Sequence, residues 1–523
     1  MTTSCAQKKN SPPLNQTLRL NLSDDPISLD PRVVRSLKDL TVVKQLFEGL
    51  MRIDQSGVPQ LALAKSVEIS EDFLTYTFHL RESYWNNHDP VTAYDFEYAW
   101  TKVLEHNFAS DYSYMLYPIK NAQLAREGKC LEEGIGVMAL DDRTLVVQLH
   151  TPTPYFLELV AFPTYFPINH KVDMQQKKWA LPPGDQFVCN GPFCLQKWTP
   201  QTDLILEKNP LYWDSPGVYL DKIAFLIIPD NNTENYLFEK EELDWLGQPL
   251  SNNITTEMLN QLRESGTLHS YTVAGTLWFE FNVEKEPFDS EKLRKALSYS
   301  INRQEIIEHI LQGNQRPATG PLPPSMAVQT TPYFVDADKE RAQILLKEAL
   351  LEIGLTLETL PKIFLSYHPT ERNTKIAQLV QQQWRSTLGF EVELQSVERQ
   401  LYRNKVRQGH FQIGIGEWIA DFNDPVAFLE LFKYKNNSET GSGMNGTGWQ
   451  NEAFVSLLNQ SLTESDLIKR TGLLRQAEQI LMDEMPIAPV YHYAFDYVKK
   501  DYVHDVVLSP LGPADFKTTR LVR

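Results

Sequence analysis

Between about residue 290 and residue 432, segments with the spacing of a helix alternate with segments with the spacing of a strand. Apolar residues recur every three or four positions in the expected helices and at every second position in the expected strands. The helices are expected over 339–352, 373–387, 397–408 and 425–432, and the strands over 362–367, 390–396 and 411–416. Because such alternation is typical of a sheet covered by helices, this half of the chain predicts an α/β lobe.

The first 290 residues mix the same signals without a regular strand–helix repeat. Strands are expected over 18–22, 73–80, 143–149 and 220–228, and helices over 42–51 and 91–104. Thr92 and Asp95 have the spacing of a capping box at the start of the second helix. A length of 523 residues allows roughly three domains, so a chain of the α/β class with more than one lobe is expected.

Two further helices are expected within 286–312, where helix-start signals occur twice. Asp289 is a candidate N-cap for the first helix. Asn302 is a candidate N-cap for the second, with Glu305 three residues further on. These signals predict structure and carry no chemistry.

The stretch GEWIADFNDP (416–425) follows an alternating strand in which Gly414, Gly416 and Trp418 share one face. Glycine in the interior of a strand often marks the close approach of another backbone. Two glycines beside an aromatic ring therefore make this face a candidate surface for a bound chain.

Two aspartates close this stretch, and they are expected to have different roles. Asp424, directly before Pro425, has the position of a helix N-cap. Asp421 has no such task and follows a strand end, where sites in open α/β sheets usually lie. A carboxylate there can receive an ammonium group, and Trp418 can cover an apolar side chain or a cation. The alternative, a surface-turn aspartate beside a core tryptophan, stays open on spacing alone.

Composition and missing motifs exclude several classes of function. The formal net charge of −17 argues against nucleic acid partners and against adsorption to anionic lipid. The sequence shows neither an apolar run of about 18 residues, which a transmembrane helix needs, nor a signal-peptide pattern. It contains no metalloprotease, nucleophile-elbow or phosphate-loop motif. We therefore expect no catalytic residues, no metal and no cofactor.

The four cysteines leave alternatives open. Cys5 lies in a polar, flexible leader expected over 1–16, and is either an ordinary leader residue or the lipid-bearing first residue of a mature lipoprotein. Cys189 and Cys194 flank a turn signal, so a local disulfide between them is one alternative. None of the cysteines has the C-x2-C spacing of a metal site.

Eight segments, taken together in their order and spacing, resemble the periplasmic dipeptide- and oligopeptide-binding proteins, the large (family 5) solute-binding components of ATP-driven importers. The similarity extends from about residue 17 to residue 510. The segments are SLDP (28–31), QLFEGLMRID (45–54), LALAKSVEISEDFLTYTFHLRESYWNNHDPVTAYDFEYAW (61–100), NGPFCLQKW (190–198), ELDWLGQPL (242–250), FNVEKEPFDSEKLRKALSYSINRQEII (281–307), WIADFNDP (418–425) and AEQILMDEMPIAPVYHY (477–493).

The resemblance implies a two-lobed, hinged α/β fold of the class II periplasmic-binding-protein type, with an inserted subdomain in the first lobe. It divides the chain into a first lobe of three pieces, 17–45, 186–271 and 489–523, an inserted subdomain over 46–185 and a second lobe over 272–488. A peptide would lie extended between the lobes and pair with the protein main chain to main chain.

The resemblance also implies which residues bind the ligand. Asp421 matches the aspartate that binds the ligand's α-ammonium, and Trp418 matches a wall of a side-chain pocket. Backbone groups would come from Glu417 and Ile419 beside Gly416, and from an opposing strand. The remaining implied contacts are Leu277 and Trp278 on that opposing strand, Tyr112 from the inserted subdomain and Tyr493 from the C-terminal crossover.

The sequence departs from the family pattern where ligand carboxylates are received. Ile415 stands where many members have an arginine, and Asn373 stands nearest to the position of a histidine, with His368 and Arg372 offset from it. Arginines four residues apart offer a replacement on one helix face, and the alternative is an ordinary solvated basic face. These arginines are Arg399, Arg403 and Arg407.

The expected function is the capture of short peptides by a monomer at the periplasmic side or outer face of the cytoplasmic membrane, with delivery to the permease of an ABC importer. Three alternatives stay open. The same scaffold can carry another cargo, such as murein tripeptide, a nickel chelate, haem or a sugar; the chain can be a peptidase; or it can be a folding helper that holds unfolded chains.

Overall fold

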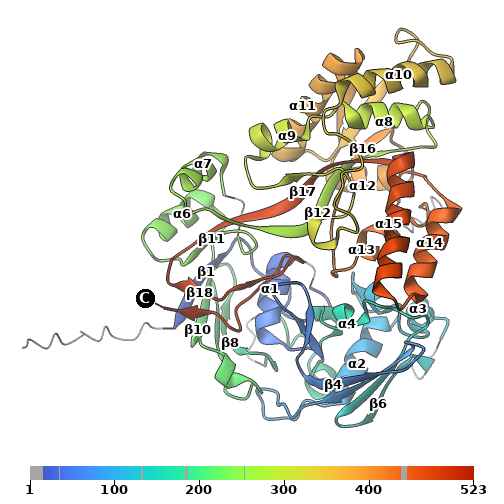
Figure 1. The fold of residues 1–523 in the computed structure, drawn as a ribbon. Helices are drawn as coiled ribbons and strands as arrows, with labels where there is room; N and C mark the ends of the chain where they lie inside the picture. The colour runs from blue at the N-terminus through green and yellow to red at the C-terminus, as the bar shows by residue number, and fades with distance from the viewer. Residues whose placement is uncertain are drawn as a thin grey trace, which may run out of the picture.

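Three sheets of four or more strands organise the chain in the computed structural model (Figure 1). The structure describes residues 16–34, 36–130, 134–182, 186–251, 254–436 and 445–522. Nearly all of the expected leader, with Cys5, lies outside these ranges, as does most of the polar loop expected at 436–448. No helix of the described residues combines the length and the apolar character that crossing a membrane requires.

The first sheet has the strand order β1-β10-β9-β8 and joins distant parts of the chain. β1 runs parallel to β10, while β9 is antiparallel to both of its neighbours. The predicted alternation at 18–22 is confirmed, because Leu18, Leu20 and Leu22 are fully buried in the sheet. The strands are β1 (Thr17–Leu22), β8 (Phe193–Thr199), β9 (Asp203–Lys208) and β10 (Lys222–Ile227).

The second sheet is antiparallel, with the order β4-β5-β7-β6, and lies between two strands of the first sheet in the sequence. Tyr76, Phe78 and Leu80 on β5 point into the core as their spacing predicts. Helix α2 packs on β6 and β7, and the Thr92 N–H donates to Asp95 as the capping-box spacing predicts. The elements are β4 (Ala64–Ile69), β5 (Thr75–Leu80), β6 (Val137–Asp141), β7 (Thr144–Gln148) and α2 (Ala93–Leu104).

The third sheet has the order β11-β17-β12-β16-β14-β15 and holds most of the second half of the chain. Its two longest strands, β12 and β17, run side by side and connect the lower and upper parts of the molecule in Figure 1. Its strands are β11 (Trp245–Gly247), β12 (His269–Phe281), β14 (Ile363–Tyr367), β15 (Val392–Ser396), β16 (Ile413–Ile419) and β17 (Ile487–Lys499), with β13 (Arg316–Pro317) paired to β17.

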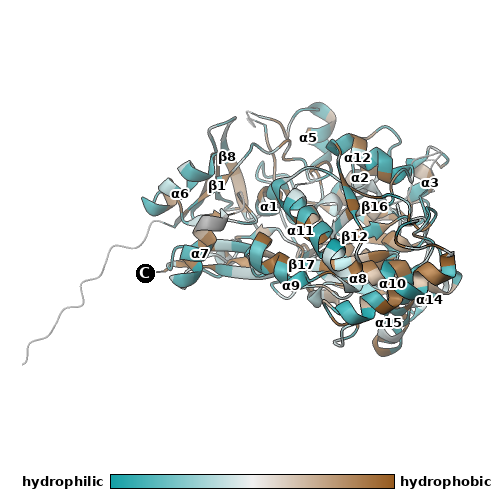
Figure 2. Cartoon of the chain, turned by 90° about the horizontal axis from the view of Figure 1, so that it is seen from above, coloured by the Kyte–Doolittle hydropathy of each residue, from teal (hydrophilic) through white to brown (hydrophobic). Residues whose placement is uncertain are grey.

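Helices cover the sheets and carry mixed hydrophobic and hydrophilic stretches, as Figure 2 shows for α8 and α10. Short strand pairs complete the fold: β2 (Met51–Ile53) with β3 (Pro59–Leu61), β18 (Val503–His504) with β21 (Arg520–Leu521), and β19 (Val507–Leu508) with β20 (Ala514–Asp515). The other helices are α1 (Leu37–Leu46), α3 (Ala122–Arg126), α4 (Phe156–Leu159), α5 (His170–Gln175), α6 (Asn231–Glu239), α7 (Thr256–Glu264), α8 (Glu291–Tyr299), α9 (Arg303–Ile306), α10 (Lys339–Ile353), α11 (Glu371–Leu388), α12 (Arg399–Arg407), α13 (Val426–Leu429), α14 (Glu452–Thr463) and α15 (Leu467–Glu484).

Two large clusters of buried apolar residues stabilise the fold. One fills the space between the third sheet and α8, α10 and α11, and includes Ile413 and Ile415 of β16. The other joins the first two sheets and extends to buried residues of α13, α14 and α15. Strand β16 therefore lies between the clusters, with its isoleucine face in one of them.

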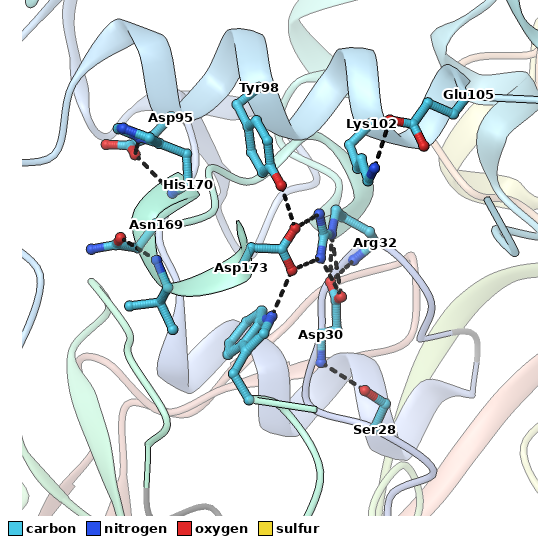
Figure 3. Close-up of polar contacts among 12 residues, drawn as sticks. Ser28, Asp30, Arg32, Asp95, Tyr98, Lys102, Glu105, Asn169, His170 and Asp173 are labelled. Atoms are coloured by element: carbon cyan, nitrogen blue, oxygen red, sulfur yellow. Dashed lines mark hydrogen bonds and ion pairs between the residues drawn. The ribbon is translucent and has the colours of Figure 1, made fainter. Parts of the chain in front are cut away.

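A buried polar network ties the SLDP segment to α2 and α5 (Figure 3). The Arg32 guanidinium, 2% exposed, lies between the carboxylates of Asp30 and Asp173, at 2.7 Å from each. Asp173 also accepts hydrogen bonds from the Tyr98 hydroxyl and the Trp179 indole, at 2.7 and 2.8 Å. Since removing one member of a buried pair is costly, this network fixes the N-terminal segment against the second sheet.

Two local predictions about helix starts are wrong. The helix expected over 42–51 is α1, which lies five residues earlier because the Ser36 hydroxyl accepts from the Asp39 N–H and caps it. Helix α8 is capped by Ser290, one residue after the predicted Asp289, through a contact to the Leu293 N–H. The predicted cap of α9 is confirmed, since the Asn302 side chain accepts from the Glu305 N–H at 3.0 Å.

A disulfide between Cys189 and Cys194 is not formed; both are free thiols in the structure. The Cys189 Sγ is directed to the carbonyl oxygen of Phe193, 3.5 Å away, and its backbone N–H is held by Asn86. Burial raises the pKa of the Cys189 thiol well above its ordinary value, so the thiol is protonated and unreactive.

Candidate functional site

Strand β16 has one fully paired edge and one edge that is largely open. It pairs with β12 from Ile413 to Ile419, but with β14 only through Ile413 and Gly414. Among the described residues, no other strand continues this second edge. The last residues of β16 therefore present an edge to which an extended chain can add.

Hydrogen bonds show which backbone groups face the open edge. The Ala420 N–H donates to the Ala274 carbonyl of β12, at 2.8 Å. The N–H and C=O of Ile415 point the other way, since both bond to the Tyr402 hydroxyl at 2.8 Å. Because the bonding direction alternates along a strand, the backbone groups of Glu417 and Ile419 also face the open edge.

Asp421 follows this edge and has neutral partners. The Tyr114 hydroxyl donates to its Oδ2, and Tyr112 also bonds to the carboxylate. Burial raises its pKa from 3.8 to about 6, and the two tyrosine hydrogen bonds oppose this rise only in part. Among the described residues, no cationic side chain forms an ion pair with Asp421, so the site has room for a cation.

Asp424, three residues later, is satisfied by the protein itself. Arg470 bonds both of its carboxylate oxygens, at 2.7 and 2.9 Å, and the pair is buried. Asp424 also accepts from the Val426 N–H at 3.0 Å at the start of α13. Asp424 therefore has a structural role at the start of α13, although Pro425, one residue later than predicted, is the N-cap of that helix. Asp424 differs from Asp421 in that an arginine neutralises its charge.

A cationic group lies further along the same edge. The Arg372 guanidinium donates to the Glu417 carboxylate at 2.6 Å and to the Tyr493 hydroxyl at 2.9 Å. The Tyr493 hydroxyl in turn donates to Glu417. These three side chains come from α11, β16 and β17 and fix the orientation of the guanidinium.

Three cavities meet around these groups. A cavity of about 390 Å³ has Asp421 and Arg372 in its wall. A larger one, of about 830 Å³, continues past Arg372 and Tyr493, and a smaller one, of about 220 Å³, lies on the other side of Asp421. The residues of the 390 Å³ cavity are Tyr112, Arg372, Glu417, Trp418, Ile419, Asp421 and Tyr493.

Six residues singled out in the sequence thus lie together in one cavity wall. They are Tyr112, Glu417, Trp418, Ile419, Asp421 and Tyr493. The Trp418 indole N–H is buried and lacks a hydrogen-bond partner among the described residues, which leaves a donor beside the cavity.

Two expectations about this surface are wrong. Leu277 and Trp278 cannot offer backbone groups to a ligand, because β12 is paired to β16 on one edge and to β17 on the other. The space above Gly416 is not open to a ligand backbone either. A Cβ at Gly416 would lie 2.4 Å from the Trp278 indole nitrogen, and one at Gly414 would lie 2.8 Å from Glu280. The glycines therefore admit large side chains of β12.

The basic face of α12 lies apart from these cavities. Arg403 and Arg407, like Arg399, are exposed, and among the described residues none of them lines a cavity beside Asp421. Their arrangement is that of a solvated helix face. The cation that borders the site is Arg372. In the sequence, Arg372 lies close to the position at which many family members have a histidine that receives a ligand carboxylate.

Sequence reasoning missed Tyr114 as a partner of Asp421. The signal available was the pair of tyrosines two residues apart in ASDYSYML, of which only Tyr112 was singled out. Both tyrosines reach the site because η1 (Ser113–Leu116) turns the chain so that their rings lie 6.1 Å apart. Among the described residues, no group of acidic, histidine and cysteine side chains is arranged to hold a metal.

Comparison with known proteins assigns the chain to a family. Residues 58–440 match the family model of bacterial extracellular solute-binding proteins, family 5. The chain belongs to this family. It is 44% identical over 506 residues to the oligopeptide-binding protein OppA of Bacillus subtilis, an alignment that covers 96% of this chain and 92% of that protein.

Solved structures of family 5 proteins share the whole fold. The murein tripeptide-binding protein MppA, in its unliganded open form, matches with a TM-score of 0.84 and 28% identity over 98% of each chain. OppA of Listeria monocytogenes, bound to peptide, matches with a TM-score of 0.75 and 29% identity, over 98% of this chain and all of that one. The predicted two-lobed α/β fold is confirmed, and the family places the chain outside the cytoplasm.

The two neighbouring aspartates are expected to affect stability in opposite directions. The raised pKa of Asp421 means that the folded protein binds this proton more tightly than the unfolded chain, so stability is lost as pH rises from 3.8 through about 6. Asp421→Asn removes the ionisation and should stabilise the ligand-free protein at pH 7.5 by about 2–3 kcal/mol. The gain should vanish below pH 4 in urea titrations.

Asp424→Asn is the matched control, because it removes a carboxylate that Arg470 neutralises. This variant should be less stable than the natural chain at pH 7.5. A loss of stability in both variants at pH 7.5 would show that Asp421 is also neutralised within the protein.

Proposed function

We propose that this chain captures short peptides outside the cytoplasmic membrane and delivers them to the permease of an ABC importer. The observation that carries the proposal is a half-buried carboxylate, Asp421, with neutral partners at the end of a strand with an open edge. The names of its relatives support the class of cargo, since OppA of Bacillus subtilis is an oligopeptide-binding protein and the matching Listeria structure holds a peptide.

Main-chain pairing supplies affinity that does not depend on peptide sequence. The outward-facing backbone groups of Glu417 and Ile419 bond to the backbone of an extended ligand, which adds a strand to β16. Side chains of the ligand then alternate between the cavity walls and the solvent. Trp418 covers one of them and offers its free indole N–H.

The ammonium group of the peptide fixes the register. When the ligand's ammonium group approaches Asp421, it supplies a positive charge for the carboxylate. The Tyr114 hydroxyl then either keeps its hydrogen bond to Asp421 alongside the ammonium group or loses it. Breaking a buried pair of this kind typically costs about 3–5 kcal/mol. The free amino end of the ligand is therefore a main determinant of binding.

Arg372 receives the carboxylate at the other end of a short peptide. Its guanidinium borders both the 390 and the 830 Å³ cavity, and Glu417 and Tyr493 already orient it. Guanidinium–carboxylate contacts are short, directional and charge-assisted. The proposal assigns no role to Arg403 and Arg407, whose side chains lie on the exposed face of α12.

Closure of two lobes completes capture. The first lobe comprises 17–45, 186–271 and 489–523 and carries an inserted subdomain over 46–185, and the second lobe spans 272–488. Tyr112 and Asp421 come from opposite parts, so a ligand that contacts both stabilises the closed form. The protein acts as a monomer, without cofactor or metal, and Cys5 anchors it to the membrane where it is lipidated.

Murein tripeptide is the second candidate cargo. The fold matches that of MppA with a TM-score of 0.84, and a ligand of this class also carries a free amine. Native mass spectrometry of protein purified from its host distinguishes the two cargoes by the mass of the bound molecule. Incubation with a peptide library, with no cleavage products, separates capture from peptidase activity.

Replacing Asp421 should abolish recognition of the peptide's amino end. We expect Asp421→Ala to weaken binding of an unmodified tripeptide at least about 100-fold, because a cost of 1.4 kcal/mol corresponds to tenfold in affinity. N-acetylation of the tripeptide should weaken binding to the natural chain by a similar factor. Calorimetric titration measures both effects.

In Asp421→Ala, the free and the N-acetylated tripeptide should bind with equal affinity. The substitution and the acetylation each remove the same contact, that between the Asp421 carboxylate and the ligand's ammonium group. Equal affinities of the natural chain for free and acetylated tripeptides would contradict the assignment of Asp421.

Replacing Arg372 should remove recognition of the carboxylate end. Arg372→Gln is expected to weaken binding of the free tripeptide about tenfold, and binding of its C-terminal amide much less. Arg407→Gln, on exposed α12, is the matched control and should leave both affinities unchanged. A preference for the free carboxylate that persists in Arg372→Gln would refute this role.

A further inference from the structure

The cavity of about 220 Å³ next to Asp421 has the size and the charged lining of a binding site for a side chain. Its walls come from α1, the α4 region, the end of β16 and the C-terminal segment. One water occupies about 30 Å³ in the liquid, so a side chain of several heavy atoms fits. Three ionisable residues line it with Tyr112: Lys44, Glu158 and Asp421.

Lys44 is directed into this cavity by α1, which lies below the long strands in Figure 1. Leu37, Leu40 and Lys44 follow one another at intervals of three and four residues, so they share one face of the helix. Lys44 is only 7% exposed. The helix therefore places an ammonium group at the end of an otherwise apolar surface.

Two carboxylates near Lys44, those of Glu48 and Asp515, share the single Arg52 guanidinium and also favour the charged form of Lys44. Arg52 bonds Glu48 at 2.9 Å and Asp515 at 2.5 and 2.8 Å. Among the described residues, no carboxylate forms an ion pair with Lys44. Burial lowers the pKa of Lys44, and the nearby Asp515 and Glu48 carboxylates oppose this lowering only in part. A carboxylate entering the cavity would favour the charged form of the lysine.

Lys44 and Asp421 line the same cavity, yet they form no ion pair with each other. Among the described residues neither side chain forms an ion pair, and a charge removed from water is stabilised when a bound group supplies a hydrogen-bonded counter-charge. A single ligand residue that carries both an ammonium and a carboxylate group would satisfy both. Leu40, Phe162 and Leu511 also line the cavity and offer apolar surface for the methylene groups of such a residue.

We propose that this cavity receives the side chain of the first residue of a bound peptide, and that Lys44 selects peptides in which this side chain carries a carboxylate. The inference rests on the proposed function, since it places the peptide's ammonium at Asp421. It goes further by naming a preference for an acidic residue, aspartate or glutamate, at the first position only.

Glu158 can donate to such a side chain in its protonated form. Burial raises its pKa to about 7, so about half of it is protonated at neutral pH, and an incoming carboxylate would favour this form further. The other charges near it, Asp424 and Arg470, neutralise each other. The walls thus hold one cation and one proton donor for an incoming carboxylate.

Calorimetric titration with Glu-Ala-Ala and Gln-Ala-Ala tests the inference, because the two peptides differ only in the charge of the first side chain. The natural chain should bind Glu-Ala-Ala at least about tenfold more tightly. In Lys44→Gln the two affinities should become equal, and in Lys44→Arg the preference should persist. Lys65→Gln, which removes an exposed lysine on β4, should leave the preference intact.

The position of the acid provides an internal control. Ala-Glu-Ala and Ala-Gln-Ala should bind equally, since their second side chain does not reach Lys44. Equal binding of Glu-Ala-Ala and Gln-Ala-Ala to the natural chain overturns the inference, whether or not the Lys44 variants fold, and leaves the proposed function standing. If none of the four peptides binds, the proposed function itself fails.

Discussion

The unequal pairing of β16 is the constraint on which the site depends. One edge is held along its whole length by β12, while β14 covers only two residues of the other. The first pairing fixes the strand in the third sheet, and the incomplete second pairing leaves Glu417 and Ile419 with outward backbone groups. The sheet thus presents an incompletely paired strand edge to a ligand.

Some charged side chains around this edge also lack an ion pair within the described part of the protein. Asp424 pairs with a buried arginine, whereas Asp421 accepts hydrogen bonds from tyrosine hydroxyls. Among the described residues, Lys44 forms no ion pair, although the Asp515 and Glu48 carboxylates lie near it. Leaving buried charges without partners reduces stability, and this cost is recovered when a ligand supplies them. Under the proposed function, this arrangement would make the protein recognise the ends of a peptide more strictly than its middle.

Much of the local structure could be predicted from the sequence, because the spacing of apolar residues and the positions of helix-start residues depend on nearby residues only. Alternation located β1, β5 and β16, and the Asp-Pro dipeptide separated the structural Asp424 from Asp421. Contacts between distant segments could not be predicted. The glycines of β16 suggested ligand contact, but the sheet order places Trp278 and Glu280 over them, and the Tyr114 and Arg372 contacts require the folded arrangement.

A crystal structure of the complex with an unmodified tripeptide tests the central claim most directly. The account predicts the ligand's amino nitrogen within about 3 Å of an Asp421 carboxylate oxygen, as for charge-assisted hydrogen bonds. It also predicts ligand backbone bonded to Glu417 and Ile419 along the open edge. A peptide whose amino group points to solvent, with Asp421 still bonded only to tyrosine, would contradict it.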